Sequence, residues 1–100
     1  MKLRFADKAR RDLVEIAEYV AMDSPKQADL LVARIEDCCH GLLDSPMRFP
    51  VVRKRAGVEL RRVVLGNYSI FYMAAPDVVQ IVRILHAARD LDSLFPLDDD

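Results

Sequence analysis

The sequence has few of the residues that build flexible or cross-linked proteins. Of 100 residues only three are glycine and five are proline, so long flexible linkers are not expected. The two cysteines, Cys38 and Cys39, are adjacent and cannot join distant parts of the chain by a disulfide. No apolar run approaches the ~20 residues of a membrane span, and the N-terminal residues do not resemble a signal peptide. These absences predict a cytoplasmic protein with reduced thiols.

The composition favours one folded domain. Apolar residues make up 52% of the chain, which argues against intrinsic disorder. We expect a single domain over residues 1–97 and an acidic tail at Asp98, Asp99 and Asp100. The charge sum is 15 basic minus 16 acidic residues, or −1, which excludes a uniformly basic protein held to nucleic acid by bulk charge.

The first half of the chain begins with a short strand at residues 3–5 and a helix that Asp7 is expected to cap. The apolar residues of this helix recur at spacings of three and four. Its stripe consists of Ala9, Leu13, Ile16 and Val20, widened by Val14, Ala17 and Ala21. Asp12, Glu15 and Glu18 are expected to lie on the outer, solvated face.

A second helix follows with a clear start signal. Ser24 is the expected cap, Pro25 occupies the first helical position, and Gln27 completes a capping box. Its apolar stripe consists of Ala28, Leu31, Ile35, Cys39 and Leu42. The helix is expected to end near Leu43, and the short link predicts an antiparallel helical hairpin.

The second half of the chain is predicted to form strands. Residues 46–57 are expected to be a loop. Strands are predicted at residues 58–65, 68–74 and 78–85, joined by short turns. The resulting order is β-α-α-β-β-β. This order indicates the α+β class, with a helical hairpin packed on an antiparallel sheet.

The near-zero net charge is a sum of opposed blocks. Residues 7–44 carry five basic and nine acidic side chains, whereas residues 48–62 carry six basic and one acidic. A positive block of this density suits docking of an acidic peptide, a protein partner or a phosphate backbone. The alternative is a solvated loop whose arginines pair with the acidic helices.

Candidate chemical groups are sparse. His86 beside Asp90 could act as a general base with an orienting carboxylate, although a structural role at the strand end is favoured. Cys38, Cys39 and His40 superficially suggest a metal site. Adjacent cysteines on a helix point about 100° apart, and the usual spacer is missing, so no metal or other cofactor is expected.

Several short motifs occur in a characteristic order over residues 3–95. They are Ala9-x-x-Asp12-Leu13-x-x-Ile16-x-x-Tyr19, the second helix ending in Ser45-Pro46, Arg48-Phe49-Pro50, Leu60-Arg61, Gly66-Asn67-Tyr68-Ser69-Ile70-Phe71-Tyr72, and Val79-x-Ile81-x-Arg83-Ile84-Leu85-His86-x-x-Arg89-Asp90. With these motifs the chain resembles the ParE toxins of the RelE/ParE superfamily of bacterial toxin–antitoxin systems. That resemblance implies the helical-hairpin-on-sheet fold.

The resemblance also separates two activities. RelE-like members cleave messenger RNA on the ribosome with sheet lysines and arginines and a late Tyr or His. This chain has Ser69 where those members have an arginine, and Ala87 and Ala88 at a position that is often basic. In place of the Tyr or His near the C-terminus it has Leu94 or Phe95, which cannot exchange protons. The resemblance therefore implies a ParE-like toxin that is not an enzyme and that inhibits DNA gyrase by protein–protein contact.

The resemblance further implies a ParD-like antitoxin whose C-terminal segment wraps the toxin. We expect its acidic side chains near Arg53, Lys54, Arg55 and Arg61, and its apolar side chains in a groove beside the helical hairpin. Candidates for contact with the target are Arg83, His86 and Arg89. DNA would be contacted only through the antitoxin. The alternatives are a ribosome-dependent endonuclease that uses Arg61, Arg83, His86 and Arg89, and a non-toxic relative that binds antitoxin.

Overall fold

The two helices begin at Asp7 and Pro25, which are residue types that favour the first turn of a helix. The computed structural model describes residues 1–87. Helix α1 spans Asp7–Ala21 and α2 spans Pro25–Gly41. Ser24 caps α2 as predicted, and its side chain accepts a hydrogen bond from the Gln27 backbone N–H at 3.2 Å. The expected cap of α1 is wrong: Ala6 holds the cap position, and Asp7 lies in the first turn, where its charge favours the helix N-terminus.

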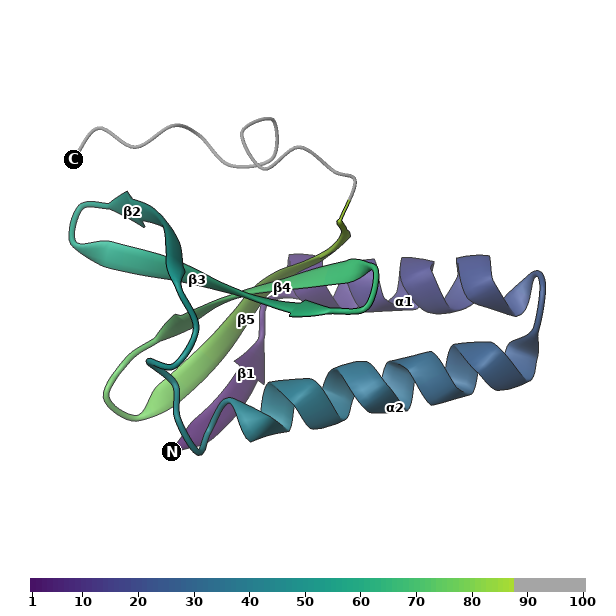
Figure 1. Ribbon diagram of the computed structural model, residues 1–100, viewed down its shortest axis with the longest axis horizontal. Helices are drawn as coiled ribbons and strands as arrows, with labels where there is room; N and C mark the ends of the chain where they lie inside the picture. The colour runs from purple at the N-terminus through teal and green to yellow at the C-terminus, as the bar shows by residue number, and fades with distance from the viewer. Residues whose placement is uncertain (88–100) are drawn as a thin grey trace.

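The helices form a hairpin that covers one face of a sheet (Figure 1). Ala9 on α1 and Ile35 and Cys39 on α2 are completely buried in the core between the two layers. The predicted stripes are therefore correct for most of their residues. Val14 is an exception, because 56% of it is exposed and it does not widen the buried face of α1. Figure 1 also shows the hairpin extending well past the sheet.

Residues 1–87 contribute five strands to the sheet. They are β1 (Lys2–Phe5), β2 (Val51–Arg55), β3 (Val58–Leu65), β4 (Tyr68–Ala74) and β5 (Val78–His86), in the spatial order β1-β5-β4-β3-β2. Strand β1 runs parallel to β5, and the other pairs are antiparallel. The sheet is thus mixed rather than purely antiparallel, because β1 and β5 run in the same direction. The α+β class is confirmed.

Strand β2 corrects the expectation that residues 46–57 form only a loop. It pairs with β3, and the two are joined by a two-residue turn at Ala56 and Gly57. Both turn residues have positive φ angles, 50° and 80°, as tight hairpin turns of the primed types require. Glycine accommodates this backbone without strain. Strand β2 lies at the sheet edge, where a run of basic residues is tolerated because one side of the strand is open to solvent.

The sheet separates two groups of apolar side chains. Ile70 and Tyr72 on β4 point to the helices and belong to the main core. A smaller cluster forms on the opposite face around Leu60, Phe71 and Leu85, which are each less than a tenth exposed. Within residues 1–87, no helix is long and apolar enough to cross a membrane.

Candidate functional site

Asp12 and Arg83 form an ion pair that links α1 to β5. Arg83 donates from Nε to Asp12 Oδ2 at 2.7 Å and from Nη2 to Oδ1 at 2.9 Å. The same Oδ2 accepts the backbone N–H of Ile84 at 3.0 Å. The expectation that Asp12 lies on the solvated face of its helix is therefore wrong: Asp12 is only 8% exposed.

The position of this pair follows from the short first strand. Strand β1 ends at Phe5, which pairs with Ile81, so the next part of β5 has no strand on that side. The Asp12 carboxylate takes the place of a strand carbonyl there by accepting the Ile84 N–H. Hydrogen bonding to Asp12 raises the pKa of Arg83 above its ordinary value, although burial acts in the opposite direction. Arg83 is thus a charged, partly buried group that Asp12 holds in place.

Arg61 on β3 is also bound by partners within the chain. Its Nη1 donates to the carbonyl oxygens of Phe49 at 2.6 Å and Met47 at 3.1 Å, and its Nη2 contacts Glu59 at 3.2 Å. The Tyr72 hydroxyl donates to the Pro46 carbonyl at 2.7 Å in the same connecting segment. Burial raises the pKa of Tyr72, which favours the neutral hydroxyl needed for this bond. The segment between α2 and β2 is therefore fixed by two side chains from the sheet.

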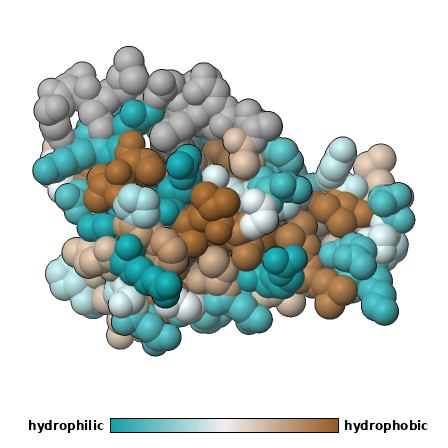
Figure 2. Space-filling model, viewed as in Figure 1, coloured by the Kyte–Doolittle hydropathy of each residue, from teal (hydrophilic) through white to brown (hydrophobic). Residues whose placement is uncertain are grey.

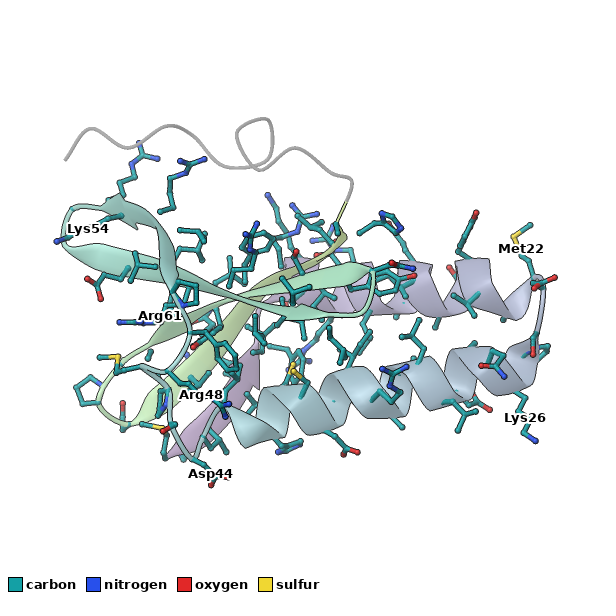
Figure 3. The ribbon with its side chains drawn as sticks, in the orientation of Figure 1. Met22, Lys26, Asp44, Arg48, Lys54 and Arg61 are labelled. Atoms are coloured by element: carbon teal, nitrogen blue, oxygen red, sulfur yellow. The ribbon has the colours of Figure 1, made fainter. Side chains whose placement is uncertain are left out.

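The other basic residues of the positive block divide between the two faces of the sheet. Arg53 pairs with Leu60 and Arg55 pairs with Val58, so both project to the face opposite the helices. Arg62 has the same orientation because it pairs with Phe71. We call this surface the basic–apolar face; it consists of Arg53, Arg55, Arg62, Leu60 and Phe71. Lys54 lies on the other side with Arg61, and both are labelled in Figure 3.

A groove lies where α1 runs beside the ends of β4 and β5. Its volume is about 340 Å³. It is lined by Asp12, Glu15, Ile16, Tyr19, Tyr68, Ile84, Leu85 and His86, of which Asp12 is buried. The rings of Tyr68 and His86 meet edge to face, with centroids 5.6 Å apart. We call it the α1 groove. The α1 groove brings together residues of α1, β4 and β5 that the sequence did not predict to form one site.

Apolar residues are also exposed where the hairpin extends past the sheet. Tyr19 is 75% exposed, Met22 85% and Leu30 49%. Figure 2 shows hydrophobic surface along the helices, and Figure 3 places Met22 at the end of the hairpin.

The cysteines have the character of packing residues. Burial raises the pKa of the Cys39 thiol to about 12, and burial also raises the pKa of Cys38. A thiolate is the form that binds metal or attacks an electrophile, so both reactions are disfavoured here. Within residues 1–87, no three His, Cys, Asp or Glu side chains come together in a way that could hold a metal ion.

The residues considered for RNA cleavage do not converge within the described part of the chain. Arg61 is on β3 and Arg83 on β5, with β4 between them, and each guanidinium is bound by different partners. His86 is exposed at the end of β5 beside Tyr68. Arg89 and Asp90 lie outside the described residues, as do Ala88, Leu94, Phe95 and the terminal aspartates.

The sequence does contain a signal for the burial of Asp12. Asp12 lies three residues after Ala9 and four before Ile16, in line with the buried stripe of α1. A carboxylate in such a stripe needs a partner, and Arg83 interrupts the apolar strand β5.

Comparisons with known proteins agree on one superfamily. The family described as "ParE toxin of type II toxin-antitoxin system, parDE" matches residues 3–91. The chain is similar to Toxin RelE2 of Caulobacter vibrioides, with 36% identity over 83 residues that cover 82% of this chain and 90% of that protein.

Two solved structures have the same fold. One belongs to the chromosomal ParDE system of P. aeruginosa, with a TM-score of 0.69, 26% identity and coverage of 86% of this chain and 95% of that one. The other belongs to the RelBE2 toxin–antitoxin complex of Mycobacterium tuberculosis, with a TM-score of 0.60, 24% identity and coverage of 85% and 95%. The second likeness concerns the fold alone.

Proposed function

The chain belongs to the ParE family of type II toxin–antitoxin toxins, and we propose that it inhibits DNA gyrase by protein–protein contact and is neutralised by a ParD-like antitoxin. In this proposal the protein makes and breaks no bonds itself. It acts in the cytoplasm by holding gyrase on cleaved DNA, which stops replication. Contact with DNA through the antitoxin alone is part of the same proposal.

The observation that carries this proposal is that the guanidinium groups of both sheet arginines, Arg61 and Arg83, are bound by partners within the chain. A nuclease of RelE type needs cations free to bind the phosphate as charge develops on it. Here the Arg83 guanidinium makes two bonds to Asp12, and that of Arg61 makes bonds to two carbonyls and to Glu59. Ser69, at a position where RelE-like relatives have an arginine, is a buried residue only 5% exposed. These features support a binding protein rather than an enzyme.

The test is a supercoiling assay with purified gyrase, relaxed plasmid and increasing amounts of the full-length protein. We expect loss of supercoiling and accumulation of cleaved plasmid after denaturation. Addition of the antitoxin should reverse both effects. Gyrase that remains fully active at a large excess of toxin would refute the gyrase proposal.

A second function has one specific observation in its favour, namely the relationship to Toxin RelE2. It would be cleavage of messenger RNA on translating ribosomes with the help of Arg61, Arg83, His86 and Arg89. Primer extension on transcripts from cells that express the protein decides between the two functions. Intact transcripts in growth-arrested cells support the gyrase proposal, and new ribosome-dependent ends support cleavage. Normal growth without antitoxin would indicate a non-toxic relative.

The basic–apolar face is the surface that we propose for the antitoxin. Two of the residues predicted from the sequence, Arg53 and Arg55, share this face with Arg62 and the apolar cluster. An acidic segment with apolar side chains would complement both features. Lys54 lies on the other side of the edge strand, so it would contact a part of the antitoxin that reaches that side. Arg61 is bound to the chain itself, so its contribution to the antitoxin surface is mainly to hold the neighbouring segment.

This assignment is tested by reversing charge on the face. The double variant Arg53→Glu/Arg55→Glu should bind the antitoxin more weakly and with a shallower dependence on salt, because fewer ion pairs form. The matched control is Lys8→Glu/Lys26→Glu on the exposed surfaces of α1 and α2, which changes the net charge equally. Calorimetry at two salt concentrations measures both quantities. Equal effects of the two double variants would contradict the placement.

A further inference from the structure

The α1 groove has the composition of a site for a cationic side chain. Its lining includes the apolar side chains of Ile16 from α1 and Ile84 from β5, which are more buried, and two phenol rings and a carboxylate, of which Tyr19 and Glu15 are exposed. The rings are those of Tyr19 and Tyr68, and the carboxylate is that of Glu15. Aromatic faces and carboxylates both attract cations, and an apolar lining suits a long aliphatic stem.

Two carboxylates line the α1 groove, and that of Glu15 is the one available to a bound cation. The Asp12 carboxylate is already engaged by both Arg83 and the Ile84 N–H. Glu15 is exposed and makes no ion pair with another residue of the described chain, although it contributes to the field at Arg83. Arg83 itself is directed at Asp12 by two hydrogen bonds, which reduces its opposition to a second cation.

The α1 groove is lined by two tyrosines from different elements, Tyr19 of α1 and Tyr68 of β4. Tyr19 is 75% exposed, so its ring is open to a partner. Tyr68, from the sheet side of the groove, is half-buried, and its contact with the His86 ring restrains its orientation. A guanidinium is planar, stacks on aromatic faces and forms paired hydrogen bonds with a carboxylate, whereas an ammonium is a compact and strongly hydrated charge.

We infer that the α1 groove binds an arginine side chain that a partner protein presents, with its guanidinium between Tyr19, Tyr68 and Glu15 and its stem on Ile16 and Ile84. The α1 groove lies where helix α1 meets the sheet, separate from the basic–apolar face, and it selects the opposite charge. The protein therefore has two docking surfaces that prefer partner groups of opposite charge. This inference does not depend on the assignment of gyrase as the target.

The experiment is an NMR titration of the labelled full-length protein with three probes. They are N-acetyl-arginine amide, the citrulline amide that has the same shape without charge, and the tripeptide acetyl-Leu-Arg-Leu amide. We expect millimolar binding of the arginine amide, with shifts at Tyr19, Tyr68 and Ile84, much weaker binding of the citrulline amide, and tighter binding of the tripeptide. Equal shifts with arginine and citrulline would overturn the inference, as would weaker binding of the tripeptide than of the arginine amide.

Variants identify the groups involved. Glu15→Gln should weaken arginine binding about threefold to fivefold, in the range of a single partly exposed ion pair. Tyr68→Leu should have a similar effect, and Glu36→Gln on the exposed side of α2 is the matched control with no effect. Because Glu15 is exposed, its variant keeps the fold. Unchanged affinity in Glu15→Gln, or equal losses in Glu15→Gln and Glu36→Gln, would refute the site.

Discussion

The ion pair between Asp12 and Arg83 provides the sharpest test of how the fold is held together. In the variant Asp12→Ala the guanidinium of Arg83, whose side chain is 18% exposed, loses both of its carboxylate contacts. The backbone N–H of Ile84 loses its acceptor as well. Removing one partner of a buried ion pair costs about 3–5 kcal/mol, and an unsatisfied buried donor costs about 1–3 kcal/mol.

These two costs do not add fully, because water can reach part of the guanidinium once the carboxylate is gone. Alanine also favours the helix over aspartate by up to ~0.7 kcal/mol, which offsets part of the loss. We therefore expect the free energy of unfolding to fall by about 3 kcal/mol, a large share of the roughly 5–15 kcal/mol typical of a domain. The melting temperature of a domain of this size should fall by about 12–24 °C.

Urea unfolding followed by circular dichroism measures the effect. Asp12→Asn keeps an acceptor for the Ile84 N–H but loses the charge, so its loss should be intermediate. The control Asp29→Ala, on the exposed side of α2, should change stability by no more than about 0.5 kcal/mol. Adding Arg83→Met to Asp12→Ala should recover part of the loss, since the uncompensated charge is removed. A cost of Asp12→Ala within ~1 kcal/mol of the control would refute this reasoning.

Three further predictions concern the Tyr72 hydroxyl and the cysteines. Tyr72→Phe should lower the free energy of unfolding by about 1 kcal/mol, because the Pro46 carbonyl loses its donor; a neutral result in urea unfolding would indicate that this bond does not hold the segment. Burial raises the native pKa of Tyr72 above 10, so its contribution to stability is present below pH 10 and is lost as the pH rises through the native value; Tyr72→Phe should flatten this alkaline decline. A thiol reagent at mildly alkaline pH should modify Cys38 before Cys39, whose pKa is about 12, and equal rates in the native protein would contradict the burial of Cys39.

Local signals in the sequence were sufficient for most of the fold. Ser24, Pro25 and Gln27 specify the start of α2 by bonds that form within one turn, so no distant contact has to be known. The strands β3, β4 and β5 show apolar alternation or continuous apolar runs between short turns. These features depend on neighbours in the chain, and a sequence displays them directly.

The parts that could not be predicted depend on distant contacts. Strand β2 has three consecutive basic residues and becomes a strand only because β3 offers it an edge. The parallel pairing of β1 with β5 depends on where the helices return the chain. The burial of Asp12 depends on a cation 71 residues away. The α1 groove combines α1 with the ends of two strands, which no local pattern brings together.

The pairing of the first strand with the last has a consequence for how the protein is made. Lys2 lies opposite Val78, and Asp12 pairs with Arg83, so neither the N-terminal strand nor the Asp12 carboxylate has its partner until β5 has been synthesised. Contacts that span most of a chain form late and slow the folding of a domain. We therefore expect the sheet of the nascent chain to stay incomplete until β5 has emerged. The Asp12–Arg83 pair should likewise be absent from any intermediate that precedes the pairing of β5.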